Sequence, residues 1–302
     1  MAVSDIQGNS SKTPRLTPGR PRVSGPVEPR YHARTLADSN ETIRQSPHRT
    51  ENQKGIKSST LGMAVQYLGH SALYFSSPGR VRVVIDPFQN PRGRPRWFTK
   101  RFPVLKAQVV VSTHDHFDHN AIKFINGLPA ILKKRGSLKL NDVEVRLTPE
   151  IHSEYLHRKA SSGTQMVNNL VMVESHGVRT CHLGDNRADI SPEALNQLGR
   201  IDVLLLPVDD SEHILTFAEV DQLIEMISPK VVLPIHYFQE GITADTADLD
   251  GITRWLMHMG DRAEVRYSDI SRIVLSPAEM ERVEGLEIWP LAPALATGRA
   301  VI

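Results

Sequence analysis

"STHDHFDHN", residues 112–120, places three histidines and two aspartates within nine positions. The apolar run "AQVVVS", residues 107–112, leads directly into it and is typical of a strand buried on both faces. His114 and His116 are two residues apart, so a tightly turned loop can aim both imidazoles at one metal ion. Asp118 and His119 then face the other way, towards a second ion. Imidazole and carboxylate are ligands that Zn(II), Mn(II) and Fe(II) accept.

Four ligands are too few for two ions, so the rest of the chain must supply more. "TPEIHSEYL" places His152 after one apolar run, "CHLGDN" places Asp185 after another, and "VVLPIHYF" places His236 after a third. Each run ends at the residue concerned, as a strand ends at the edge of a sheet. A carboxylate such as Asp185 can bridge two cations, with one oxygen to each. The sequence therefore predicts a metal centre assembled from strand ends.

Composition restricts the class of protein and its compartment. The chain has 302 residues, of which 40% are hydrophobic and 23% charged, values that are ordinary for a globular protein. A single cysteine, Cys181, excludes a disulfide or a thiolate-rich zinc site within this chain and fits a reducing compartment. No apolar stretch reaches the ~20 residues that a membrane span requires. We expect a cytoplasmic protein, either a monomer or a homo-oligomer.

The chain divides at about residue 60. Residues 1–60 are rich in Pro, Arg and Ser, carry 10 Lys+Arg against 5 Asp+Glu, and favour a disordered basic tail. The whole chain is formally +2, so residues 61–302 carry about −3. Within this second part, strand-like runs form hairpins up to Asp185 and then alternate with helical patterns. A short helix is predicted at 121–128, ended by Gly127. Sheets with helices on their outer faces are the expected architecture.

The ordered set "HDHFDH", "HS", "GD" and "PIHY", with "YLGHSALYF" and "VVIDP" before it, resembles the metallo-β-lactamase superfamily over roughly residues 64–270. Within that superfamily it looks like the subgroup that includes L-ascorbate-6-phosphate lactonases. The stretch "LLLPVDD", followed by "HILTFAEV", also resembles the subgroup, but the subgroup usually carries glycines where Asp209 and Asp210 stand. Because of this departure, the resemblance does not predict the substrate contacts of that loop.

The resemblance implies an α/β fold, a four-layer αββα sandwich with a dinuclear site at one edge. It also implies a ligand set for each ion. The first ion takes His114, His116 and His152, the second takes Asp118, His119 and His236, and Asp185 bridges them. Two such cations lower the pKa of a bridging water, which then attacks the substrate as hydroxide. Zinc is the default metal, manganese and iron stay open, and Asp118 and Asp185 are the expected catalytic carboxylates.

Further residues are expected around the ligands. His70 in "GHS" and Asp86 in "IDP" are placed behind them, where Asp86 could accept a hydrogen bond from a metal-bound imidazole; the alternative for both is an ordinary turn residue. The basic loop 90–102 is either a solvated surface or a grip on an anionic substrate. The remaining candidates are Arg94, Arg96 and His157 for substrate binding, and His213 and Tyr237 as proton donors.

These residues predict a metal-dependent hydrolase that cleaves an ester, lactone, amide or phosphoester bond of a small anionic molecule. A phosphodiesterase or nuclease acting on nucleic acid or phospholipid is the main alternative, supported by the basic tail and loop. Redox chemistry at a di-iron site and a non-catalytic metal-binding module of the same fold are the other two. The ligand set alone does not choose among the bonds or the substrates.

Overall fold

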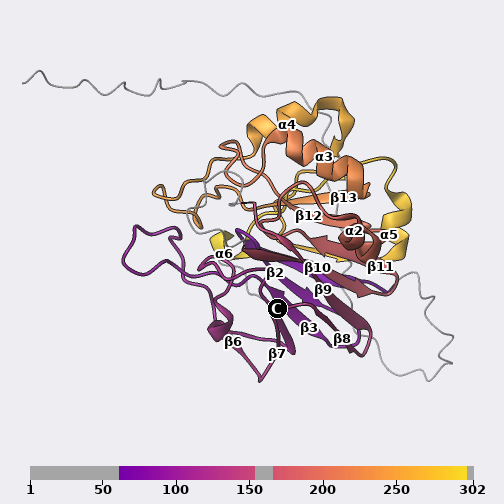
Figure 1. Ribbon diagram of the computed structural model, residues 1–302, viewed down its shortest axis with the longest axis horizontal. Coiled ribbons are helices and arrows are strands. Elements are labelled where there is room, and N and C mark those ends of the chain that lie inside the picture. The colour runs from indigo at the N-terminus through magenta and orange to yellow at the C-terminus, as the bar shows by residue number, and fades with distance from the viewer. Residues whose placement is uncertain (1–60, 154–165, 298–302) are drawn as a thin grey trace, which may run out of the picture. The chain divides into compact units, whose positions relative to one another are not determined.

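The computed structural model describes residues 61–153 and 166–297, and two sheets organise that part of the chain (Figure 1). The predicted tail, residues 1–60, lies outside the described residues. The six-stranded sheet has the order β15-β1-β2-β3-β5-β7. Its strands are β1 (Met63–Gly69), β2 (Ala72–Ser76), β3 (Arg82–Ile85), β5 (Val109–Val111), β7 (Ala130–Leu132) and β15 (Arg272–Leu275).

The second sheet has eight strands in the order β14-β16-β13-β12-β11-β10-β9-β8. They are β8 (Gly136–Leu140), β9 (Val143–Ile151), β10 (Val167–Ser175), β11 (Val178–His182), β12 (Val203–Pro207), β13 (Val231–Ile235), β14 (Glu264–Val265) and β16 (Glu287–Ile288). A further short pair joins β4 (Leu105–Lys106) to β6 (Ile125–Asn126). The helices are α2 (Pro192–Leu198), α3 (Phe217–Ile227), α4 (Thr253–Met259), α5 (Pro277–Arg282) and α6 (Ala294–Thr297), with 3-10 turns η2 (Ile122–Phe124) and η3 (Gly260–Arg262).

The two sheets pack face to face because their strands carry apolar side chains on both faces. Leu205 of β12 points between the sheets with Phe75 and Val171, whereas its neighbours Leu204 and Leu206 point outward. The outward side chains meet α2, α3 and α4, and Figure 1 shows α3 and α4 over β12 and β13, away from the indigo strands. The predicted α/β sandwich with helices on an outer face is confirmed.

The opposite outer layer is built differently. Val84 and Val110 of the six-stranded sheet are covered by Phe88 and Phe98 from the long loop after β3, together with Ala294 of α6. That loop is the basic segment noted in the sequence, so its aromatic residues anchor it to the sheet. Its arginines are consequently held close to one edge of the sandwich.

One predicted helix is absent from the described structure. Residues 121–128 form only the single turn η2, after which Ile125 adopts an extended conformation and pairs with Leu105. Ile125 is buried in the same apolar cluster as Leu105 and Phe102. Packing of this side chain therefore outweighs the local helical preference.

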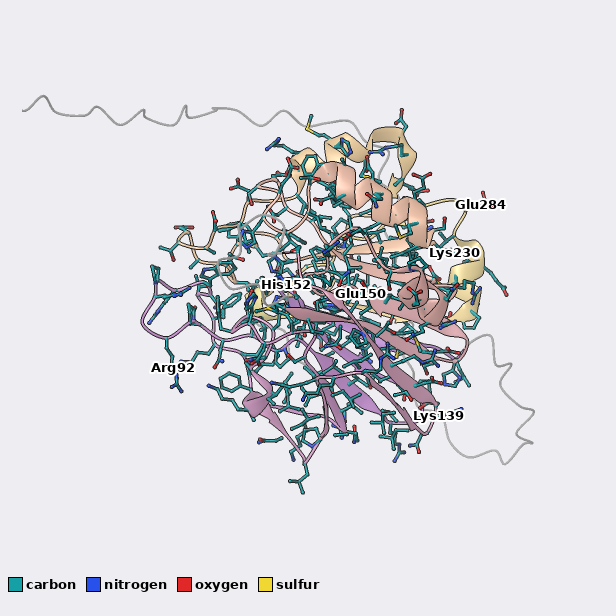
Figure 2. The ribbon with its side chains drawn as sticks, in the orientation of Figure 1. Arg92, Lys139, Glu150, His152, Lys230 and Glu284 are labelled. Carbon is teal, nitrogen blue, oxygen red and sulfur yellow. The ribbon has the colours of Figure 1, made fainter. Side chains whose placement is uncertain are left out.

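The strand ends that carry the candidate ligands lie at one edge. β11, β12 and β13 run parallel, and β9 is antiparallel to β10, which is antiparallel to β11. In Figure 2, His152 lies at this edge, on the side from which the loop with Arg92 projects, whereas Lys139 and Lys230 lie at the other side. Among the described residues, no helix is long and apolar enough to cross a membrane.

Candidate metal centre

The loop after β5 is folded back by its own backbone. Ser112 Oγ donates to the carbonyl of His114 at 2.7 Å, and the N–H of His119 donates to the carbonyl of His116 at 3.1 Å. This compact turn brings His114 Nε2 to 3.1 Å from His116 Nδ1. Two imidazoles separated by one residue therefore reach a common point, as the spacing predicts.

The candidate ligands gather into two groups. Within each group the ligand atoms lie within 4.8 Å of one another. One group contains His114, His116, His152 and Asp185, and the other contains His70, Asp118, His119 and His236. All seven predicted ligands are thus brought together, and His70, predicted to lie behind the ligands, also lies within the second group. Its Nε2 lies 3.1 Å from Asp118 Oδ2.

Asp185 lies between the two groups. Its Oδ2 is 3.7 Å from His114 Nε2 and 3.6 Å from His152 Nε2, both in the first group. The same oxygen is 3.4 Å from His236 Nε2, and Oδ1 is 3.4 Å from His119 Nε2, both in the second group. One carboxylate therefore faces four imidazoles that approach it from both sides.

The polar atoms at the centre are buried and short of partners. Among the described residues, His119 Nε2, His236 Nε2 and Asp185 Oδ1 make no hydrogen bond. Leaving a buried polar atom unsatisfied costs about 1–3 kcal/mol, so three such atoms facing one point need a common partner. Imidazole nitrogens and a carboxylate oxygen in this arrangement fit divalent cations of the zinc type.

The charges of the centre also favour a cation. Burial alone would raise the pKa of Asp185, but the imidazoles of His119, His236 and His114 outweigh it and hold that pKa well below its usual range. Burial opposes a charge on His119 too, yet Asp185, Asp118 and Asp86 raise the pKa of this imidazole well above normal. Asp185 therefore stays ionised and favours positive charge beside it.

Asp86 connects the two groups from behind. Its Oδ2 accepts from His119 Nδ1 at 2.8 Å and from Thr113 Oγ1 at 2.8 Å, while Oδ1 accepts from the N–H of Thr113 at 2.8 Å. Thr113 Oγ1 is in turn 3.0 Å from His114 Nδ1. One carboxylate thus sets the orientation of an imidazole in each group and leaves Nε2 facing the centre.

Three of these residues adopt a backbone conformation that ordinary side chains avoid. The φ angles of His70, Asp86 and His236 are +56°, +49° and +61°. Left-handed backbone costs roughly 1–2 kcal/mol per non-glycine residue, and such residues cluster at functional sites. Each lies just after a strand, where the left-handed turn redirects the chain and aims the side chain at the centre.

Three supporting residues had not been predicted from the sequence. His182 Nε2 donates to the carbonyl of Ser71 at 2.9 Å, and its Nδ1 accepts from the N–H of Gly184 at 3.0 Å. Asn168 Oδ1 accepts from the N–H of Asp185 at 3.1 Å. Gly184 has φ +60°, and a Cβ there would lie 2.2 Å from Asn168 Oδ1. The sequence feature that could have indicated them is the presence of polar residues inside apolar strand runs.

A cavity of about 440 Å³ opens onto the metal groups. His116, Asp118, His152, Asp185 and His236 line it, together with Arg94, Trp97, His213 and Asp248. The ring of His213 stacks on His236 with centroids 6.0 Å apart, and its Nδ1 lies 3.8 Å from Asp248 Oδ2. Arg96 instead lines a separate cavity of about 400 Å³ with Lys100 and Phe102. His157 lies outside the described residues.

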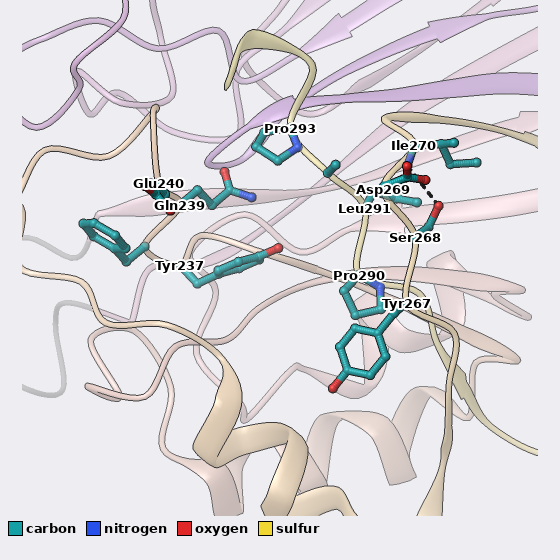
Figure 3. Close-up of a pocket in the computed structure, with 12 residues that line it drawn as sticks. Tyr237, Gln239, Glu240, Tyr267, Ser268, Asp269, Ile270, Pro290, Leu291 and Pro293 are labelled. Carbon is teal, nitrogen blue, oxygen red and sulfur yellow. Dashed lines mark hydrogen bonds between the residues drawn. The ribbon is translucent and has the colours of Figure 1, made fainter. Parts of the chain in front are cut away.

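Tyr237 does not line the metal cavity. Its hydroxyl points into a different cavity of about 710 Å³, which Tyr267 and Leu291 also line (Figure 3). We therefore do not propose Tyr237 as a proton donor.

Comparison with known proteins shows the family of the chain. A model of the beta-lactamase superfamily domain matches residues 64–236, more than half of the chain, and that range contains all seven candidate ligands. The chain belongs to the metallo-β-lactamase superfamily. Similar members of the superfamily include the UPF0173 metal-dependent hydrolases of Archaeoglobus fulgidus and Korarchaeum cryptofilum. The first is 30% identical over 200 residues, which cover 58% of this chain and 83% of the relative. The second is 28% identical over 196 residues, with coverages of 57% and 82%.

A solved structure from Thermotoga maritima, described as a Zn-dependent hydrolase of the metallo-β-lactamase superfamily, has the same fold. The two align with a TM-score of 0.55 and 22% identity over 76% of this chain and 99% of that one. At this identity the likeness shows the fold alone. The finer resemblance to L-ascorbate-6-phosphate lactonases stays a prediction.

Proposed function

We propose that the chain is a metal-dependent hydrolase that holds two divalent cations, zinc by default. The first cation would be held by His114, His116 and His152, the second by Asp118, His119 and His236, and both by Asp185. The observation that carries this proposal is the position of Asp185, within 3.4–3.7 Å of imidazoles from both groups. The relatives named metal-dependent hydrolases support the reaction class.

Two bound cations would supply a water of lowered pKa and would polarise the bond that it attacks. The residues of the chain fix the geometry around that reaction. His70 Nε2 lies 3.1 Å from Asp118 Oδ2 and would fix the orientation of that carboxylate towards the second cation. Asp86 and Thr113 fix the imidazoles from behind. His119, Asp185 and His236 are each at most 2% exposed, so bulk water is excluded from most of the centre.

The cavity suggests a small anionic substrate. Its volume of about 440 Å³ fits a small molecule, and Arg94 on its wall offers a guanidinium to a carboxylate or phosphate. Trp97 and Ile214 provide apolar surface on the same wall. The bond that is cleaved is an ester, lactone, amide or phosphoester.

His213 is the remaining candidate for a proton donor to the leaving group. It lines the cavity beside His236, and Asp248 lies 3.8 Å from its Nδ1. The charge of Asp248 would favour the proton on Nδ1 and so leave Nε2 for the substrate. His213→Gln should then lower kcat while metal content stays unchanged, and an unchanged kcat would remove this role.

Metal content measured together with hydrolysis tests the proposal. Purified protein should contain two equivalents of a divalent cation by elemental analysis and should hydrolyse a substrate from a panel of esters, lactones, amides and phosphodiesters. Asp185→Asn should lose both cations and the activity, because the residue contacts both groups. Asp189→Asn is the matched control, since its exposed carboxylate pairs with Arg187 outside the metal groups.

The outcomes separate the alternatives. Full metal content and activity in Asp185→Asn would refute the shared role of this carboxylate. Two bound cations without hydrolysis across the panel would favour a non-catalytic module. Bound iron with an absorption spectrum that changes under oxygen would favour redox chemistry.

A further inference from the structure

Three large aliphatic side chains are exposed on the outer layer of the six-stranded sheet. Leu128 is 100% exposed, Val104 64% and Ile131 55%. Leu128 lies in the turn between β6 and β7, which projects from the lower end of the ribbon in Figure 1. Exposed apolar side chains that lie together mark an interaction surface, whereas single ones are ordinary, so their relative positions matter.

The paired strands β4 and β6 turn one face outward. Leu105 is opposite Ile125, and both side chains are buried in the outer-layer cluster. Because side chains alternate along a strand, Val104 and Lys106 on either side of Leu105 point outward, and both are exposed. The outward face of this pair therefore combines an aliphatic and a cationic side chain.

The edge strand β7 continues that surface. Ile131 is opposite Val110 of β5, so both side chains point to the face of the sheet that the outer layer covers. Only residues 127–129 separate β6 from β7, which places Leu128 between the outward face of β4 and β6 and the exposed side chain of Ile131. The three aliphatic side chains, Val104, Leu128 and Ile131, thus lie along one border of the outer layer and are called the apolar edge below.

Leu128 contributes little to the isolated fold. It adopts left-handed backbone, with φ +55°, which a leucine resists and a glycine or asparagine accepts. Its side chain is fully exposed, so it gains no stability from burial to offset this strain. A partner that covers the side chain would supply that burial.

The part of the sequence around the apolar edge is strongly basic. Residues 87–140 contain 11 Lys+Arg and 2 Asp+Glu, a net of +9 (11 − 2). Residues 61–302 come to −3 in total, so the remainder of that part carries −12. Of the two acidic residues, Asp118 is buried in the second metal group and Asp115 pairs with a lysine. Neither neutralises the surface at the apolar edge.

Unpaired cationic side chains lie beside the apolar edge. Lys106 is on the outward face of β4, and Lys123 lies in η2, directly before β6. Arg101 lines the cavity of about 400 Å³ together with Phe124. All three cationic side chains are exposed, and the structure gives them no ion pair with a described residue.

The charge decides between the possible partners. Residues 1–60 carry +5, and a second copy docked by the same face would bring the same positive charge, so both would be repelled. Nucleic acid would match the charge, but aliphatic side chains offer its bases no ring to stack on. An anionic phospholipid bilayer matches both features, because its headgroups attract lysine and arginine and its acyl chains accept aliphatic side chains.

We propose that the apolar edge and its basic surroundings dock the protein on an anionic phospholipid bilayer. Leu128 enters below the headgroups, and Lys106 and Lys123 contact their phosphates. The inference goes beyond the proposed hydrolase function and does not rest on it, because neither the metal groups nor a cleaved bond takes part in the docking.

Co-sedimentation with lipid vesicles tests the proposal on the full chain. Vesicles of phosphatidylcholine and phosphatidylglycerol in equal parts should bind the wild type at least about tenfold more tightly than vesicles of phosphatidylcholine alone. Leu128→Asn should weaken binding to the anionic vesicles by about tenfold or more, because an inserted leucine is lost. Lys106→Gln/Lys123→Gln should weaken it by roughly 25-fold, at about fivefold for each charge. Residues 1–60 are the same in every variant, so any binding through them cancels in the comparison.

Met257→Gln and Arg282→Gln are the matched controls. Met257 is 66% exposed on α4, Arg282 is exposed on α5, and Figure 1 shows both helices well away from β6. Both variants should bind anionic vesicles as the wild type does. The same loss in the controls, or undiminished binding in Leu128→Asn and in the double lysine variant, would overturn the proposal.

Thermal unfolding separates a docking role of Leu128 from a structural one. Leu128→Asn should keep the Tm of the wild type or raise it, because asparagine accepts left-handed backbone. A Tm that falls by several degrees would show that Leu128 stabilises the fold, and the argument for docking would fail.

Fluorescence measures insertion directly. Leu128→Cys, labelled with an environment-sensitive fluorophore, should shift its emission to the blue on anionic vesicles, whereas labelled Met257→Cys should not. Cys181 is buried and leaves the introduced thiol as the labelled one. An unchanged emission at position 128 would overturn the proposal. So would tighter binding of a single-stranded oligonucleotide than of vesicles, or a dimer that dissociates in Leu128→Asn without vesicle binding.

Discussion

Replacement of Gly184 by alanine tests whether the turn before Asp185 is built around a glycine. Gly184 has φ +60°, and an added Cβ would lie 2.2 Å from Asn168 Oδ1 and 2.8 Å from Thr113 Cβ. Neither neighbour can move freely, because Asn168 Nδ2 also donates to the carbonyl of Leu183 and Thr113 is held by Asp86. The methyl group would therefore displace the side chain that binds the N–H of Asp185.

The magnitude follows from a comparison with Gly177. That glycine also has a positive φ, +80°, but an added Cβ there meets no atom within 4 Å. Both substitutions carry the left-handed cost of about 1–2 kcal/mol. Gly184→Ala adds roughly 2–3 kcal/mol from overpacking and from the weakened Asn168 hydrogen bond. Its Tm should consequently fall by about 4–12 °C more than that of Gly177→Ala.

Thermal unfolding followed by circular dichroism, with and without a chelator, measures the difference. Metal content of both variants shows whether the position of Asp185 is affected. We expect Gly184→Ala to lose metal as well as stability, and Gly177→Ala to keep its metal. Equal Tm values for the two variants, or full metal content in Gly184→Ala, would refute the reasoning about this turn.

Three further predictions concern the metal support, the substrate contact and the cysteine. Asp86→Asn should weaken metal binding about 10–100-fold, because asparagine offers one acceptor oxygen where Asp86 offers two, so the N–H of Thr113 and the imidazole of His119 cannot both keep their acceptor; competition with a chromogenic chelator measures this, and wild-type affinity would contradict it. Arg94→Ala should raise KM for an anionic substrate by about tenfold, whereas Arg96→Ala, whose side chain lines another cavity, should not. Equal effects would remove the distinction between the two arginines. Burial raises the pKa of the Cys181 thiol to about 12, so the reactive thiolate stays scarce until the pH approaches that value, and iodoacetamide at pH 8 should label only unfolded protein by mass spectrometry. Labelling of the native protein would contradict this assignment.

The metal groups were the most predictable part of the molecule. His114 and His116 share a short loop, and residues such as Asp185 and His236 end apolar runs that can only be buried strands. Strand ends in a layered fold meet at an edge, so their proximity follows from the pattern of apolar residues. The distances within the groups agree with that expectation.

Side-chain direction was much less predictable. Arg94 and Arg96 are two residues apart in one loop, yet they line different cavities. His236 and Tyr237 are adjacent, yet they also line different cavities. Such outcomes depend on the path of a single loop, and a residue pattern does not report that path.

Contacts between segments that are far apart in the sequence were also not predictable. His70 enters the second metal group because the N–H of His236 donates to its carbonyl at 2.9 Å and Gln239 Oε1 accepts from its N–H at 3.0 Å. The predicted helix at 121–128 failed for a related reason, since Ile125 pairs with Leu105 about twenty residues earlier. Interactions of this range leave no periodic signal in the sequence.

The residues that follow the family match limit where this domain can be truncated or fused to another. β15 pairs with β1, which leads into His70, and β16 pairs with β13, which leads into His236. A fragment ended at residue 236 would keep every candidate ligand and yet strip the outer neighbour from the two strands that deliver these histidines. The last quarter of the chain therefore stabilises these two strands, and a gene fusion or a truncated expression clone has to retain it.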